Sequence, residues 1–170
     1  MFVLGIDPGL SRCGYGIVTR RGGSLAAAAG GVISTEPTMA LPDRLRTLAE
    51  ELRALVAEYQ PEAVVVERVF FQVNARTAMA TAQAAGVALV AAAECGCEVA
   101  QYTSNEVKQA VVGFGSASKE QVQNMVAALL DLPTRPSPPD VADALALAVC
   151  HLTSQPLRQA IAAASTGRRP

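Results

Sequence analysis

Short hydrophobic runs dominate the start of the chain, and their spacing is typical of β-strands. The runs predict strands at residues 2–7, 14–20 and 25–35. A Pro-Gly pair follows the first strand, and Gly22-Gly23 separates the second from the third. Because tight turns of this kind join antiparallel neighbours, we expect the chain to begin as a three-stranded antiparallel sheet.

Helical spacing begins after these strands. Residues 41–59 carry an apolar stripe that ends before Pro61, and a second apolar run follows at 63–67. A helix between two buried strands is the connection that parallel strands require, so we expect 63–67 to be a parallel strand. The later pattern predicts a long Ala-rich helix, a strand and three further helices, at 74–95, 98–102, 107–112, 119–130 and 140–152.

Two acidic residues end predicted strands. Asp7 closes the first apolar run, and Glu67 closes the run Ala-Val-Val-Val. Ligand sites in open α/β sheets form at this carboxyl edge. A carboxylate among buried apolar residues needs a partner, a proton or a cation to offset its desolvation. Two such positions favour a shared cation.

Two more acids begin the last predicted helix. Asp140 and Asp143 are three residues apart, which places both side chains on one helix face. Oxygen ligands in a compact acidic set suit a hard divalent cation such as Mg²⁺ or Mn²⁺. The four acids together therefore predict a metal site.

Each acid also has a structural interpretation when it is taken alone. Asp140 follows two prolines and suits a helix N-cap, and Asp143 suits the first helical turn. Asp7 precedes a Pro-Gly pair and suits a turn, whereas Glu67 could pair with the adjacent Arg68. The metal-site hypothesis rests on the four acids in combination.

The order of predicted elements is three strands, then helix, strand, helix, strand and helices. This order indicates an α/β protein with a mixed five-stranded sheet, in which three antiparallel strands are followed by parallel strands and helices flank the sheet. It is the arrangement of the ribonuclease H-like fold. In that fold, acids on the first strand, the fourth strand and the last helix converge across the sheet.

Length and charge set further limits. The 170 residues suit one domain, which we place at residues 1–155, with residues 156–170 expected to form a flexible tail. No apolar run has the length of a membrane span and the start leads straight into a strand, so we expect a cytoplasmic protein. The net charge of −1 gives no overall basic footprint, and binding to nucleic acid would need basic residues gathered on one face.

The cysteines and the histidine offer little chemistry. The four cysteines lack the paired C-x-x-C spacing of a zinc site, so we expect reduced structural thiols. His151 is the only histidine, and we expect it to be mainly structural.

Four short segments occur in a specific order along the chain. They are Gly-Ile-Asp-Pro-Gly at 5–9, Val-Glu-Arg-Val-Phe-Phe at 66–71, Val-Lys-Gln with Val-Gly within 107–113, and Asp-Val-Ala-Asp-Ala-Leu-Ala at 140–146. In order, spacing and total length they resemble the bacterial RuvC Holliday-junction resolvases, over roughly residues 1–152. The resemblance implies a homodimeric endonuclease that resolves four-way DNA junctions by paired nicks in homologous recombination and DNA repair. It also implies RuvA and RuvB as partners.

The chemistry of the acids agrees with this resemblance. Asp7, Glu67, Asp140 and Asp143 match the family's catalytic acids. Phosphodiester hydrolysis requires an activated water, neutralisation of charge on the phosphate and a stabilised leaving oxygen, all of which two divalent cations can supply without a histidine base. We expect two Mg²⁺ ions per subunit, with Mn²⁺ able to substitute, and Asp7 as the bridging ligand.

The resemblance also assigns residues to DNA binding. Phe70 matches a position that stacks on a base near the junction crossover, and Lys108 and Lys119 match lysines that approach the scissile backbone. Arg76, close to Phe70 in sequence, is a candidate phosphate contact. The structural alternatives are core packing for Phe70 and its neighbour Phe71, and solvation for the lysines.

Three other functions share parts of this pattern. An ATP-binding module of the actin and sugar-kinase type has this sheet order, but it needs a second comparable domain and an Asp-x-Gly-Thr phosphate loop, which the sequence lacks. A non-catalytic junction-binding scaffold would be expected to lose at least one acid, and none is lost. A ribonuclease or transposase-like nuclease would use the same acids on a different substrate.

Overall fold

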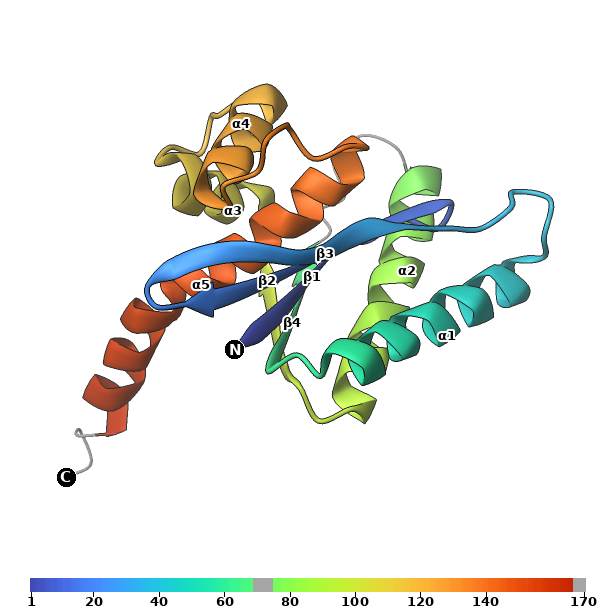
Figure 1. Cartoon of the computed structure of the whole chain (residues 1–170). Helices are drawn as coiled ribbons and strands as arrows, with labels where there is room; N and C mark the ends of the chain where they lie inside the picture. The colour runs from blue at the N-terminus through green and yellow to red at the C-terminus, as the bar shows by residue number, and fades with distance from the viewer. Residues whose placement is uncertain (69–74, 167–170) are drawn as a thin grey trace.

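The chain folds as three layers around one sheet in a computed structural model, which describes residues 1–68 and 75–166 (Figure 1). Side chains are described at residues 1–68 and 78–155. The sheet has the strand order β3-β2-β1-β4-β5, with β1, β2 and β3 antiparallel and β4 and β5 parallel to β1. The strands are β1 (Phe2–Asp7), β2 (Arg12–Arg21), β3 (Ser24–Ser34), β4 (Ala63–Glu67) and β5 (Glu98–Tyr102).

Helices cover both faces of this sheet. The two helices on one face are α1 (Leu41–Tyr59) and α2 (Ala75–Glu94). The three on the other face are α3 (Ser104–Val112), α4 (Lys119–Leu129) and α5 (Pro139–Thr166). Each face has its own hydrophobic core, because side chains alternate between the two faces along every strand.

The same alternation determines on which face of the sheet the strand-end acids lie. Leu4 and Ile6 of β1 pack in the core beneath α1 and α2, whereas Val3 packs in the core beneath α5. Asp7 therefore belongs to the α5 face. In the parallel pairing of β1 with β4, Ile6 lies opposite Val66, so Glu67 is beside Asp7 on that face.

Glycines allow α5 to lie unusually close to the sheet. Gly5, Gly16 and Gly30 are cross-strand neighbours on β1, β2 and β3. A Cβ atom at Gly5 would collide with the main-chain carbonyl oxygen of Ala144 in α5, and one at Gly16 would lie 2.8 Å from the main-chain nitrogen of Leu145. This close approach fixes the start of α5 against the strands that carry Asp7.

The predicted ribonuclease H-like arrangement is confirmed, including the antiparallel start and the parallel fourth and fifth strands. The predicted bounds at 2–7, 41–59, 63–67 and 98–102 also agree with the structure. The turn between β2 and β3 is made by Gly22 and Gly23, both with positive φ, as a two-residue hairpin favours. No helix of the described part is both long enough and apolar enough to cross a membrane.

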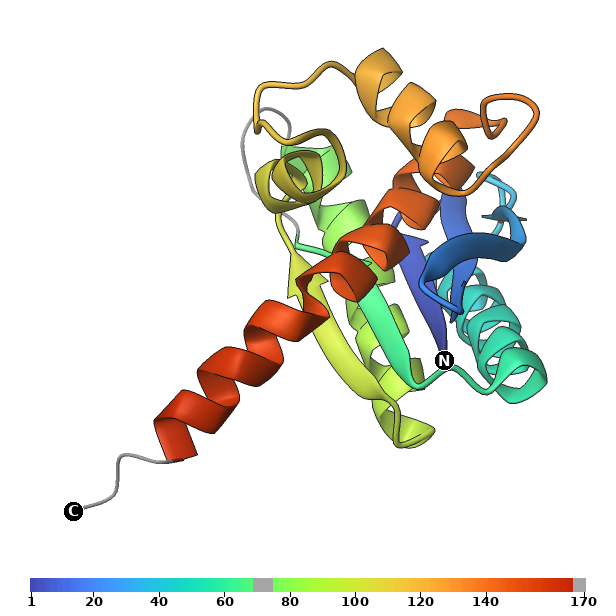
Figure 2. The same ribbon diagram turned by 60° about the vertical axis from the view of Figure 1, so that its left-hand side comes forward.

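The other predicted bounds differ from the structure by one to three residues, except at the end of the last helix, where the difference is largest. The last helix was expected to end at Leu152, yet α5 continues to Thr166 and projects away from the sheet (Figure 2). Pro156 lacks an N–H group and so leaves the Leu152 carbonyl without its usual helical donor. The guanidinium of Arg20 on β2 donates to that carbonyl instead, so the helix passes the proline. The division into a domain and a flexible tail stays a prediction.

Candidate metal and nucleic-acid site

Three of the four predicted acids line one pocket. Asp7 comes from the end of β1, Glu67 from the end of β4 and Asp143 from the first turns of α5, around a cavity of about 160 Å³. Lys108 from α3 and Lys119 at the start of α4 complete its charged lining. The pocket therefore combines carboxylates, which bind cations, with lysines, which bind phosphate.

Burial and mutual repulsion dominate the electrostatics of the pocket. Burial, and then the charges of Glu67, Asp143 and Asp140, raise the pKa of Asp7 to about 7. Burial, followed by the charge of Asp143, also raises the pKa of Glu67. Lys119 works in the opposite direction on both groups. The site holds more negative charge than its own lysines offset, which is an environment that favours a bound cation.

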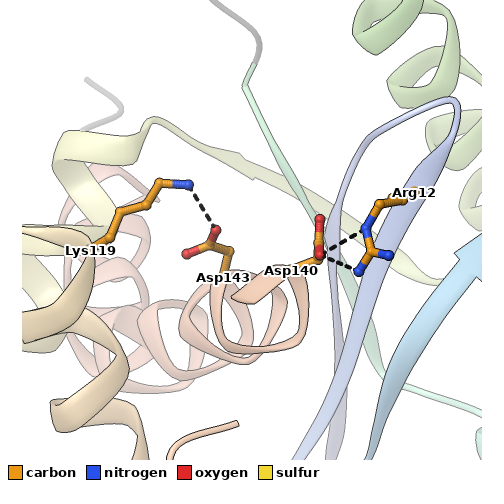
Figure 3. A network of polar contacts seen from close by, with 4 residues as sticks. All are labelled: Arg12, Lys119, Asp140 and Asp143. Carbon is orange, nitrogen blue, oxygen red and sulfur yellow. Dashed lines mark hydrogen bonds and ion pairs between the residues drawn. The ribbon is translucent and has the colours of Figure 1, made fainter. Parts of the chain in front are cut away.

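The two acids of α5 face different cations (Figure 3). Asp143 forms an ion pair with Lys119 at 3.4 Å, and this charge is the first cause of the raised pKa of Lys119. Asp140 accepts from Arg12 on β2 at 2.8 Å. The α5 helix begins at Pro139, so Asp140 belongs to the first turn, and its carboxylate binds Arg12.

The donor set fits a hard divalent cation in chemistry. All four groups are carboxylates, and the charges of the other three all raise the pKa of Asp7. Within the described residues, however, no three Asp, Glu, His or Cys side chains stand close enough to coordinate one ion together. Coordination of one ion by three of these side chains would therefore require them to move closer together.

The raised pKa of Asp7 predicts that the stability of the metal-free protein depends on pH. The folded pKa, about 7, lies above the ordinary value of 3.8, so the folded state binds the proton more tightly than the unfolded state. The free energy of unfolding therefore decreases as the pH rises from 3.8 towards 7, and it stays constant above that range. We expect Asp7→Asn to stabilise the protein by about 2 kcal/mol more at pH 8 than at pH 5.

Urea unfolding of both proteins in the presence of a chelator measures this difference. An equal effect of Asp7→Asn at the two pH values would contradict the raised pKa.

The structure describes some of the other predicted residues and not others. Lys108 and Lys119 line the pocket, and their contact with DNA stays a prediction. Phe70 lies outside the described residues, and Arg76 lies in α2 with its side chain outside the described set. His151 is fully buried, with its Nδ1 atom 3.3 Å from the Tyr102 hydroxyl, in agreement with a structural role.

Sequence reasoning missed Arg12. The predicted second strand began at residue 14, but β2 begins at Arg12, and Arg12 binds a predicted metal ligand. The sequence offered one sign. Residues two apart on a strand share a face, so a second strand extended back to residue 12 would have placed Arg12 on the same face as Gly14, which pairs with Asp7.

A protein-family model described as "Crossover junction endodeoxyribonuclease RuvC" matches residues 3–151 of the chain. A protein of that name from Moorella thermoacetica is 52% identical over 159 residues, which cover 94% of this chain and 95% of the relative. Another from Alkaliphilus oremlandii is 48% identical over 151 residues, covering 89% of this chain and 92% of the relative.

Solved structures agree with these sequence relatives. The Thermus thermophilus RuvC structure superposes with a TM-score of 0.86 at 35% identity, covering 93% of this chain and 97% of that chain. The same protein in complex with a Holliday junction substrate gives a TM-score of 0.88 at 36% identity, with 93% and 96% coverage.

Proposed function

The chain belongs to the RuvC family of crossover junction endodeoxyribonucleases, and we propose that it resolves four-way (Holliday) DNA junctions by paired symmetric nicks. This activity would serve homologous recombination and DNA repair. The observation that carries the proposal is the convergence of Asp7, Glu67 and Asp143 with two lysines around one pocket. Separate segments of the chain supply these groups, in the combination that phosphodiester hydrolysis needs.

The four acids would hold two Mg²⁺ ions per subunit, with Mn²⁺ as a substitute. When bound, such ions activate a water, neutralise the phosphate and stabilise the leaving oxygen. We assign Asp7 as the bridging ligand because of its position. It ends β1, which pairs with the strand that carries Glu67 and packs directly against α5, the helix that carries Asp140 and Asp143. Catalysis would then depend on the acids for metal binding and on the lysines for substrate contact.

Lys108 and Lys119 are proposed to contact the scissile phosphate. Both line the pocket from helices that lie opposite the acids of β1 and β4. Their ammonium groups would attract the phosphate backbone, which supplies much of the affinity of proteins for DNA. In the absence of DNA, Lys119 binds Asp143, so substrate binding would exchange one anion for another at its Nζ atom.

The segment after β4 is proposed to provide the remaining DNA contacts. Phe70 would stack on a base near the crossover, and Arg76 would bind a phosphate. Both follow the pocket residue Glu67 closely in sequence, which supports this proposal. Base stacking on an aromatic side chain contributes about 1–3 kcal/mol.

The paired aromatics give a testable contrast. We expect Phe70→Ala to reduce junction cleavage about 5–150-fold, which corresponds to the loss of about 1–3 kcal/mol of stacking. Phe71→Ala is expected to lower the melting temperature and to leave cleavage by the folded protein near the wild-type rate. Single-turnover cleavage and thermal unfolding of both variants measure the two effects. The opposite pattern would mean that Phe71 carries the stacking role.

A homodimer is proposed, because two symmetric nicks require two active sites. The helix α2 supports a dimer contact, since Met79 and Val90 are large apolar residues that are 58% and 53% exposed on it. Ala85 of the same helix is buried in the subunit's own core, so it does not contribute to this exposed surface. Partnership with RuvA and RuvB and a cytoplasmic location follow from family membership and are proposals too.

The proposed substrate is tested against its rivals by comparing a labelled four-way junction, a linear duplex of the same sequence and an RNA–DNA hybrid. Metal-dependent cutting of the junction alone supports the proposal. Preferential cutting of the hybrid would indicate a ribonuclease, and tight junction binding without cutting would indicate a scaffold. ATP binding with no affinity for the junction would favour the actin and sugar-kinase type.

A further inference from the structure

We propose that Arg12 is a positioning residue for Asp140, holding one carboxylate oxygen so that the other is presented to a divalent cation. The Nε and Nη2 atoms of Arg12 both donate to Oδ2 of Asp140, at 3.3 and 2.8 Å. Neither bond uses Oδ1. The inference rests on the metal-dependent activity proposed above and assigns a role to a residue outside the four acids.

The backbone geometry supports a fixed relation between the two residues. Arg12 and Gly14 lie on β2 with their side-chain directions on one face. A Cβ atom at Gly14 would collide with the main-chain carbonyl oxygen of Asp140. The first turn of α5 therefore rests directly on this strand, within reach of the Arg12 guanidinium.

The segment that leads into Arg12 is also anchored. Arg44 on α1 donates to the Ser11 hydroxyl at 2.6 Å and to the Thr35 hydroxyl at 2.8 Å. The Thr35 hydroxyl in turn donates to the Leu10 carbonyl at 2.6 Å, and the Thr35 main-chain N–H donates to the Ser11 carbonyl. These bonds connect the loop after β1 to α1 and to Thr35, the residue that follows β3, so the backbone that leads into Arg12 is held in place.

Two physical effects of Arg12 on metal binding have opposite signs. As a positive charge, the guanidinium repels a nearby cation, so its removal would tighten metal binding. As a hydrogen-bond donor to a ligand, it orients the carboxylate, and the loss of such an outer contact typically weakens metal binding about 10–100-fold. Our proposal requires the second effect to dominate, which makes the sign of the change the decisive observation.

The experiment measures Mn²⁺ binding to the purified, DNA-free protein by the electron paramagnetic resonance of free Mn²⁺. We expect Arg12→Ala to raise the dissociation constant about 10–100-fold. Arg12→Lys, which keeps the charge but loses the planar fork, is expected to fall between Arg12→Ala and the wild type. Arg46→Ala is the matched control, because it removes an exposed Arg–Asp pair on α1 and should leave Mn²⁺ binding unchanged. Unchanged or tighter binding by Arg12→Ala overturns the proposal.

A double-mutant cycle identifies the ligand through which Arg12 acts. In an Asp140→Asn background, Arg12→Ala is expected to cause no further loss of Mn²⁺ affinity, because the oriented ligand is already gone. A full additional loss would overturn the role of Asp140. Arg12 is 52% exposed, so the variants are expected to fold, and thermal unfolding verifies this.

Junction binding in chelator separates this proposal from a DNA-contact role. Reduced junction affinity of Arg12→Ala with unchanged Mn²⁺ affinity would overturn the positioning role. If the wild type binds Mn²⁺ and Arg12→Ala weakens that binding, but the wild type cuts no junction, the proposed function fails and the role of Arg12 stands.

Discussion

Asp7→Asn is expected to reduce the cleavage of a four-way junction by about a thousandfold or more while leaving junction affinity close to that of the wild type. Asp7 is central to the site, since Glu67, Asp140 and Asp143 all act on its pKa. The amide keeps the size of the side chain but loses the negative charge that binds a cation. The loss should therefore fall on the chemical step.

Gel-shift binding in chelator and single-turnover cleavage in Mg²⁺ measure the two parts of this prediction. Asp43→Asn is the matched control, because Asp43 is an exposed acid that pairs with Arg46 on α1. Cleavage by Asp7→Asn within tenfold of the control would remove Asp7 from the metal site. A loss of junction affinity equal to the loss of cleavage would assign Asp7 to binding instead.

Gly5→Ala is expected to destabilise the protein by about 3 kcal/mol, which lowers the melting temperature by roughly 6–12 °C. The added Cβ would meet the Ala144 carbonyl oxygen and come within 3.0 Å of the Ala148 nitrogen, and both of these are main-chain atoms of α5. A flexible side chain could move aside, but here the helix must shift. Because α5 carries Asp140 and Asp143, we also expect cleavage to fall.

Gly115→Ala provides the matched control for this prediction. The nearest atom to a Cβ at Gly115 lies 3.8 Å away, which is an ordinary contact. Urea unfolding of both variants is the measurement. If Gly5→Ala were as stable as Gly115→Ala, the close contact between β1 and α5 would not constrain the site.

The bounds of some elements could be predicted because they depend only on the residues of the element itself and its neighbours in sequence. The apolar run of β1 and the apolar stripe ended by Pro61 gave the bounds of β1 and α1 as the structure has them. The end of α5 could not be predicted in the same way. It depends on Arg20 of β2, which is distant in sequence and satisfies the carbonyl that Pro156 leaves free.

The same distinction applies to the residues of the candidate site. Asp7 and Glu67 were predictable because each ends a buried strand, and parallel strands bring their ends together. The i, i+3 spacing of Asp140 and Asp143 correctly indicated a shared helix, but it did not indicate where each carboxylate points. Arg12 and Lys119 decide that direction, and their contacts form only when distant segments pack.

The central claim is that this carboxylate site resolves four-way junctions, and mapping the cuts tests it most directly. Each strand of a synthetic junction is end-labelled in turn, and the products are resolved on a denaturing gel with Mg²⁺ or with chelator. We predict two nicks at symmetric positions in strands of like polarity, only with Mg²⁺, each leaving a 5′-phosphate and a 3′-hydroxyl. Cuts that persist in chelator, or that fall without symmetry about the crossover, would contradict the account.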